Sequence, residues 1–147
     1  MKSANFVFVC LLTFAVAGSL CRVNAAPAAT LERGRYLVEQ VGMCGDCHSP
    51  RNEKGELVRE KLLQGTPLPF KPAVPMPVWA DKTPNIAGLP GWEEKDAVKF
   101  LMTGLAYNDL PARPPMPQYR FNQEDATAIV AYLRSLAPVK EATRSRK

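Results

Sequence analysis

The sequence predicts a single all-α domain in which three main helices are joined by long proline-rich loops. Apolar residues recur at helical spacing in three segments, and no segment shows the two-residue alternation of a strand. Eleven of the 14 prolines lie between Pro67 and Pro117, where the fixed φ angle and missing N–H of proline favour ordered loops. The chain is 46% hydrophobic and 22% charged, a composition that excludes a disordered chain and a coiled coil. Its length of 147 residues favours one domain over two.

The first 25 residues are typical of a cleaved secretory signal peptide. Lys2 supplies a positive charge, residues 6–20 are mostly apolar, and residues 23–25 precede the expected cleavage. A retained membrane anchor is the alternative, but 15 residues at about 1.5 Å each are short for roughly 30 Å of hydrocarbon. We therefore expect a mature chain that begins at Ala26, lies in the periplasm or another extracytoplasmic space, and has no transmembrane segment.

The first helix is expected to begin after Thr30, as its N-cap, and to end at Gly42. A shorter helix is expected over residues 56–64, between Gly55 and Gly65. The apolar stripe of the first helix consists of Leu31, Gly34, Leu37, Val38 and Val41.

The second main helix is expected to begin near Gly91 and to end at Gly104. Glu93, Glu94 and Asp96 lie in its first turn, where the helix dipole favours anionic side chains. Its apolar stripe consists of Val98, Leu101, Met102 and Leu105.

The third main helix has the clearest boundaries. Asn122 is its expected N-cap, with Asp125 three residues later, and Pro138 ends it. Its apolar stripe consists of Ala126, Ile129, Val130, Leu133 and Leu136.

The charge pattern argues against a nucleic-acid partner. Residues 26–137, the expected domain, contain thirteen basic and thirteen acidic side chains. The net charge of +5 therefore comes from the leader and from residues 138–147, which we expect to form a flexible basic tail. The domain has no basic face interleaved with aromatic residues, so we expect no nucleic acid to bind.

The haem motif, Cys44-Gly45-Asp46-Cys47-His48, carries the chemistry. Two thiols three positions apart lie about one helical turn apart, which suits covalent addition to two vinyl groups of a haem, while His48 presents an imidazole to the iron. A zinc site usually needs four ligands, and the mature chain has two cysteines and one histidine. A thioredoxin-like pair follows a strand, whereas this pair follows a helix. We therefore expect one covalently attached haem c.

Five segments carry a resemblance to a known family. They are RGRYLV (33–38), CGDCHSPR (44–51), PNI (84–86), PPMP (114–117) and AYLRSL (131–136). With these segments the chain resembles class I c-type cytochromes, including small bacterial cytochromes c and the cytochrome subunits of alcohol and gluconate dehydrogenases. The resemblance implies a class I cytochrome c fold wrapped around one haem. Many of those subunits carry three haem motifs, whereas this sequence has one.

The second axial ligand of the iron is expected to be a methionine, because His48 is the only histidine. Met43 adjoins the haem motif and Met102 lies in a helical stripe, which leaves Met76 and Met116, both flanked by prolines. The resemblance places this ligand just before the last helix and therefore implies Met116.

The resemblance also implies that Trp79 and Asn85 donate hydrogen bonds to the haem propionates. A buried indole or amide needs such a partner. The alternative is a tryptophan in the core and a solvent-facing asparagine in a turn. Arg113 is a further candidate for a propionate contact, although a solvated arginine is the default.

The resemblance implies a one-electron carrier in an extracytoplasmic electron-transfer chain, without a catalytic site of its own. The alternative is an electron-relay subunit of an alcohol, aldehyde or sugar-acid dehydrogenase complex. A peroxidase or gas sensor would need an open iron position, which a His/Met pair does not leave. In either favoured case the partners are a redox protein that donates electrons and another that accepts them.

Overall fold

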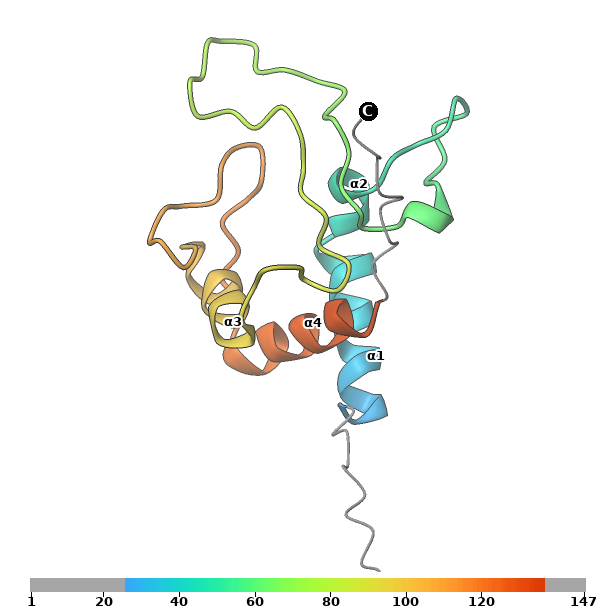
Figure 1. Cartoon of the computed structure of the whole chain (residues 1–147), viewed down its shortest axis with the longest axis vertical. Coiled ribbons are helices and arrows are strands. Elements are labelled where there is room, and N and C mark those ends of the chain that lie inside the picture. The colour runs from blue at the N-terminus through green and yellow to red at the C-terminus, as the bar shows by residue number, and fades with distance from the viewer. Residues whose placement is uncertain (1–25, 137–147) are drawn as a thin grey trace, which may run out of the picture.

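The computed structural model describes residues 26–136, and its regular structure is helical (Figure 1). Within this range strand-like pairing is limited to three isolated bridges, which confirms the all-α prediction. The expected leader, and the expected tail at residues 138–147, lie outside the described residues. No helix between residues 26 and 136 has the length and apolar character needed to cross a membrane. In chain order the elements are α1 (Ala28–Tyr36), the π-helical turn η1 (Leu37–Val41), α2 (Cys44–His48), the 3₁₀ turn η2 (Arg59–Lys61), α3 (Glu94–Thr103) and α4 (Gln123–Ser135).

The first helix begins earlier than expected and ends in a π-helical turn. Pro27 occupies the N-cap position without a side-chain hydrogen bond, so the expectation that Thr30 caps this helix is wrong. In η1 the amide of Gly42 donates to the carbonyl of Leu37 at 2.7 Å, a bond that spans five residues. The extra residue in this turn rotates Val41 out of the apolar stripe, and its side chain is 48% exposed. The prediction that Val41 belongs to the buried face is therefore wrong.

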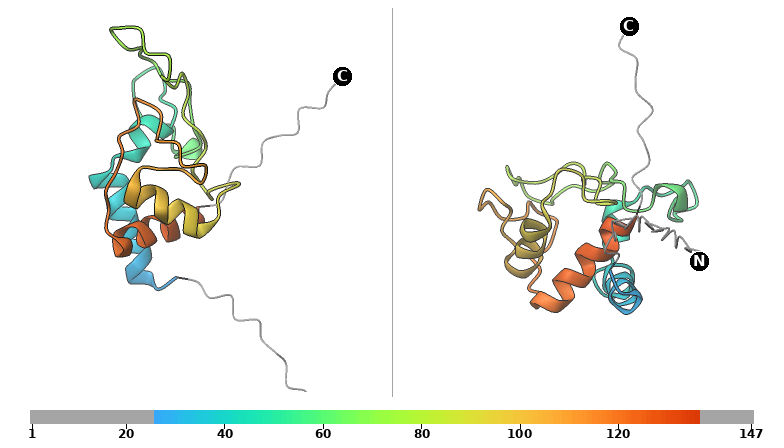
Figure 2. Two further views of the ribbon diagram at one scale, coloured as in Figure 1. Left: turned by 90° about the vertical axis from the view of Figure 1, so that its left-hand side faces the viewer. Right: turned by 60° about the horizontal axis from the view of Figure 1, so that its bottom comes forward.

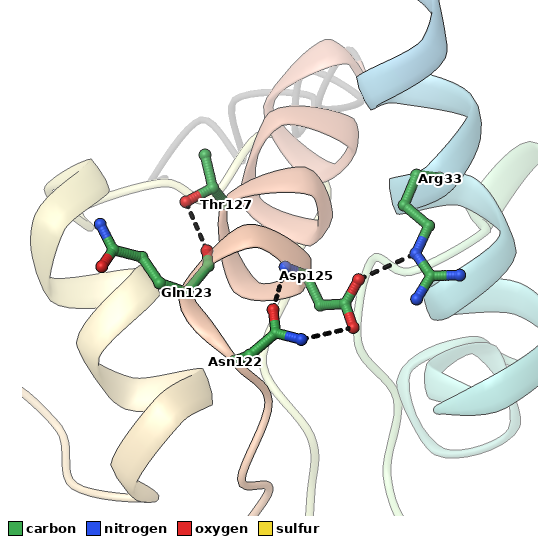
Figure 3. A network of polar contacts seen from close by, with 5 residues as sticks. All are labelled: Arg33, Asn122, Gln123, Asp125 and Thr127. Carbon is green, nitrogen blue, oxygen red and sulfur yellow. Dashed lines mark hydrogen bonds and ion pairs between the residues drawn. The ribbon is translucent and has the colours of Figure 1, made fainter.

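The last helix begins where the sequence predicts, at the side-chain cap of Asn122 (Figure 3). The Asn122 side-chain oxygen accepts from the Asp125 amide at 2.8 Å, and its Nδ2 donates to the Asp125 carboxylate at 3.3 Å. The same carboxylate accepts a hydrogen bond from Arg33 of α1 at 2.8 Å. The cap therefore also joins the first and last helices.

Helix α4 packs against both α1 and α3 (Figure 2). At the crossing with α1, a Cβ on the buried Gly34 would lie 2.0 Å from the carbonyl oxygen of Ala128 and 2.7 Å from the Cβ of Tyr132. Only glycine permits this approach of the two backbones. Beside the crossing, the Tyr132 hydroxyl donates to the Glu39 carboxylate. Burial, followed by this hydrogen bond, raises the pKa of Tyr132.

The remaining helical predictions were partly correct. Helix α3 begins at Glu94 rather than near Gly91, and it ends at Gly104, which adopts the expected left-handed conformation with φ of 73°. The helix expected over residues 56–64 is wrong, because only the three residues of η2 are helical. After Lys61 the chain is no longer helical. Leu63 then lies in the core, 1% exposed, and its amide donates to the Ser49 hydroxyl at 2.8 Å.

Two long loops extend from the helices, one drawn in green and one in orange in Figure 1. We call residues 66–85 the tryptophan loop and residues 113–119 the methionine loop. The loops are joined where the Ala80 amide donates to the Pro114 carbonyl at 2.8 Å. Arg113 adds bonds to the carbonyl oxygens of Val78, at 3.0 Å, and of Trp79. These contacts give the proline-rich segments an ordered path, as the sequence predicts.

Candidate haem site

One cavity of about 390 Å³ lies between the helices and the two long loops. Five of the six residues that the sequence nominates line it: Cys44, Cys47, His48, Asn85 and Met116. The sixth, Trp79, lies beside the cavity in the tryptophan loop rather than in its lining. Much of the wall is apolar, with side chains that include Leu37, Ile86, Leu89, Leu101, Phe121, Ile129, Val130 and Leu133.

The haem motif forms the short helix α2, so its two thiols lie about one turn apart on the cavity side. Met43, in the left-handed conformation with φ of 45°, turns the chain from η1 into this helix. Both cysteines are half-buried free thiols. Burial raises the pKa of the Cys44 thiol to about 11, so the uncharged thiol is the form that this pocket favours.

His48 is oriented by a main-chain atom. Its Nδ1 lies 2.9 Å from the carbonyl oxygen of Pro84, and because a carbonyl only accepts, Nδ1 carries the proton and Nε2 is left with a free lone pair. The side chain is only 6% exposed, and burial lowers the pKa of the imidazole. The histidine is therefore held neutral, in the tautomer that can ligate a metal through Nε2.

Two more hydrogen bonds fix the end of α2 and a third holds Thr83, which makes one of them; the sequence did not reveal these bonds. The Gly65 amide donates to the His48 carbonyl at 2.7 Å, and the Thr83 hydroxyl donates to the Cys47 carbonyl at 2.8 Å. The Thr83 oxygen also accepts from the Thr66 amide at 3.0 Å. A Cβ at Gly65 would lie 2.5 Å from the Thr83 carbonyl oxygen, so glycine is needed for this close path.

The four methionines of the described chain differ in position. Met116 lines the cavity, whereas Met76 is 38% exposed and is not part of the lining. Met43 reaches the cavity from the side of α2, next to Cys44, and is 56% exposed. Met102 lines a separate shallow groove between α3 and α4. Met116 is thus the methionine that shares the cavity with His48 without adjoining the haem motif.

Trp79, beside the cavity, carries a buried hydrogen-bond donor that has no acceptor within residues 26–136. The donor is Nε1, and the ring packs edge-on against Phe70 at 5.9 Å. A buried N–H without an acceptor is costly, so an acceptor from a bound group would satisfy it. Asn85 uses its side-chain oxygen to accept from the Ala87 amide at 2.9 Å, which leaves its Nδ2 as a donor. These donors, two thiols, a neutral imidazole and a thioether fit a haem.

Two other residues of the cavity lining make hydrogen bonds to main-chain carbonyl groups. Arg113 lines the cavity, but its guanidinium donates to the carbonyls of Val78 and Trp79 and so holds the tryptophan loop instead of being simply solvated. Tyr119 also lines the cavity, and its hydroxyl donates to the Gly42 carbonyl at 2.8 Å.

The zinc hypothesis gains no support, because no three His, Cys, Asp or Glu side chains of residues 26–136 are grouped as metal ligands.

Comparison with known proteins identifies the family of the chain. Residues 31–137 match the family model described as cytochrome c. The chain is 33% identical over 115 residues to a protein named "diheme cytochrome c-type" from Cereibacter sphaeroides, covering 74% of this chain and 36% of that protein. It is 31% identical over 114 residues to the fructose dehydrogenase cytochrome subunit of Gluconobacter japonicus, covering 71% of this chain and 21% of that subunit.

A third relative is the gluconate 2-dehydrogenase cytochrome c subunit of Pantoea cypripedii, which is 32% identical over 126 residues, or 78% of this chain and 28% of that subunit. The chain therefore spans between 21% and 36% of the length of these relatives. The family model covers most of the chain, including the haem motif, both long loops, helices α2 to α4 and α1 from residue 31 onward. The chain belongs to the cytochrome c family.

Proposed function

We propose that the chain is a monohaem c-type cytochrome that carries single electrons outside the cytoplasm and is not itself an enzyme. The observation that carries this proposal is the cavity lined together by Cys44, Cys47, His48 and Met116. A bound haem c supplies reversible one-electron chemistry at its iron. The chain contains one haem motif, which supports one haem, and the leader-like residues 1–25 support an extracytoplasmic location.

Each nominated residue has a defined task in this proposal. Cys44 and Cys47 would hold the haem covalently, and His48 and Met116 would ligate its iron. The Pro84 carbonyl keeps His48 in the tautomer with Nε2 free, and the apolar wall limits access of water. The indole N–H of Trp79 and the Nδ2 of Asn85 donate to the propionates. These two assignments rest on the buried Trp79 Nε1, which has no hydrogen-bond partner within residues 26–136, and on the Asn85 Nδ2, which remains available as a donor.

The second candidate is an electron-relay subunit of a dehydrogenase complex. It is favoured by the relatives named as cytochrome subunits of fructose and gluconate dehydrogenases. The chain covers 21% and 28% of the length of those two subunits. Its test is deletion of this chain, which should abolish electron transfer from one co-purifying dehydrogenase. If it is a free carrier, that dehydrogenase keeps its transfer to other acceptors.

The proposed function is tested by replacing Met116 and, as the matched control, Met76, each with leucine in the haem-loaded protein. Met116→Leu should abolish the near-infrared sulfur-to-iron band of the oxidised protein, lower its reduction potential, and allow the reduced protein to bind carbon monoxide. Met76→Leu should leave all three unchanged, because its side chain is outside the cavity lining. The reverse pattern would transfer the ligand role to Met76. Tight carbon monoxide binding by the wild-type reduced protein would contradict the electron-carrier assignment.

A further inference from the structure

Tyr119 connects the methionine loop to the segment that leads into the haem motif. It follows Met116 by three residues, and its hydroxyl donates at 2.8 Å to the carbonyl of Gly42, two residues before Cys44. The two residues are 77 positions apart in the chain. This hydrogen bond therefore joins the loop that carries the proposed distal ligand to the segment that carries the covalent attachment.

The local geometry at Gly42 suits this contact. Gly42 follows η1, where its amide donates to Leu37 and where helix-end carbonyls lack intrahelical partners. A Cβ added at Gly42 would lie 3.3 Å from the Cys44 Sγ and 3.7 Å from the Tyr119 hydroxyl oxygen. The Tyr119 hydroxyl thus supplies a hydrogen-bond partner to the Gly42 carbonyl at the end of η1, close to the Cys44 thiol.

The Tyr119 ring is itself held in place. It lines the cavity and stacks on Phe121, with ring centroids 5.0 Å apart and planes inclined by 23°. Burial raises the pKa of its hydroxyl to about 12, so the group remains protonated and able to donate at ordinary pH. The ring position and the protonated hydroxyl together favour a persistent bond to Gly42.

The methionine loop is secured on both sides of Met116. Before it, Arg113 and Pro114 bond to main-chain atoms of residues 78–80 in the tryptophan loop. After it, Tyr119 bonds to Gly42. A thioether is a weaker iron ligand than an imidazole, so its retention depends on how firmly the surrounding chain holds it.

We propose that Tyr119 is a positioning residue that keeps the methionine loop closed over the cavity through its bond to Gly42. The inference rests on the proposed function, because it requires Met116 to be the distal ligand. Opening the loop far enough for another ligand to replace Met116 breaks the Tyr119 bond. Loss of this bond therefore raises the population of the open loop, while the ring and its stacking on Phe121 remain.

The test is Tyr119→Phe in the haem-loaded protein, titrated with imidazole in the oxidised state and followed by absorbance. Apparent imidazole affinity should rise about five-fold, which corresponds to the roughly 1 kcal/mol that one such hydrogen bond contributes. The matched control is Tyr107→Phe, whose residue is 66% exposed and should leave the affinity unchanged. In a Met116→Leu background, Tyr119→Phe should change imidazole affinity less than two-fold.

Each result bears on a different step. An unchanged affinity in Tyr119→Phe overturns the inference, even if the free energy of unfolding falls, because a merely structural hydroxyl would affect only stability. An equal increase in the wild-type and Met116→Leu backgrounds also overturns it, since Tyr119 would then act without Met116. The Met116→Leu protein without a second substitution tests the ligand assignment. If its near-infrared band and its imidazole affinity equal those of the wild type, that assignment fails, and the role of Tyr119 fails with it.

Discussion

The crossing of α1 and α4 at Gly34 predicts an unusually large effect for the smallest possible side chain. In Gly34→Ala the new Cβ would lie 2.0 Å from the Ala128 carbonyl oxygen, about 1.4 Å short of the 3.4 Å at which ordinary contact begins. Overpacking a core costs about 1–3 kcal/mol, and contact with rigid backbone favours the upper end. Alanine regains about 1 kcal/mol because it is the better helix former. The expected net loss is about 2 kcal/mol in the free energy of unfolding.

This loss is measured by denaturant unfolding of the haem-loaded protein, with Gln40→Ala as the control. Gln40 is exposed in η1, so its replacement should stay within about 0.5 kcal/mol of the wild type. Leu37 and Val130 lie near the crossing and also line the cavity, so Gly34→Ala should broaden the haem absorption spectrum as well. A Gly34→Ala protein as stable as Gln40→Ala would refute the close backbone approach.

Two further predictions concern the cofactor and pH. Intact mass should show one haem that survives denaturation, and Cys44→Ser should weaken or abolish haem attachment; a haem that extracts freely from the wild type would contradict thioether bonding. Burial and the Glu39 bond raise the native pKa of Tyr132 above its unfolded value, so its hydroxyl stabilises the fold fully below about pH 10 and less as pH rises further. The stability advantage of wild type over Tyr132→Phe should shrink from pH 9 to 11.5, and a constant difference would contradict this.

Local signals in the sequence predicted the features that depend on neighbouring residues. The Asn122 cap and the end of α3 at Gly104 are confirmed, because each rests on side-chain or backbone chemistry within a few positions. The haem motif also forms one helical turn, as its spacing indicates. The π-helical turn was missed, since nothing in residues 37–41 distinguishes it from an ordinary helix by apolar periodicity.

Contacts between distant segments were beyond the reach of such signals. The bond from His48 to Pro84 spans 36 positions and that from Tyr119 to Gly42 spans 77, so neither leaves a local pattern. Proline residues flank both Met76 and Met116, so the local sequence does not distinguish them, and the preference for Met116 came from the family resemblance. The structure adds that Met116, unlike Met76, lines the cavity, while its ligand role stays a prediction.

The hydrogen bond that orients His48 ends on a carbonyl oxygen rather than on a side chain. Every amino acid supplies that atom, so the tautomer of the imidazole depends on the path of the chain through residues 83–85 and not on which side chain stands at position 84. Substitutions at this position alter the imidazole only if they move the backbone. By contrast, the propionate contact proposed for Trp79 depends on an indole N–H, which no other residue type provides. The orientation of the imidazole is thus determined by the path of the backbone, whereas the proposed contact of Trp79 is determined by the identity of its side chain.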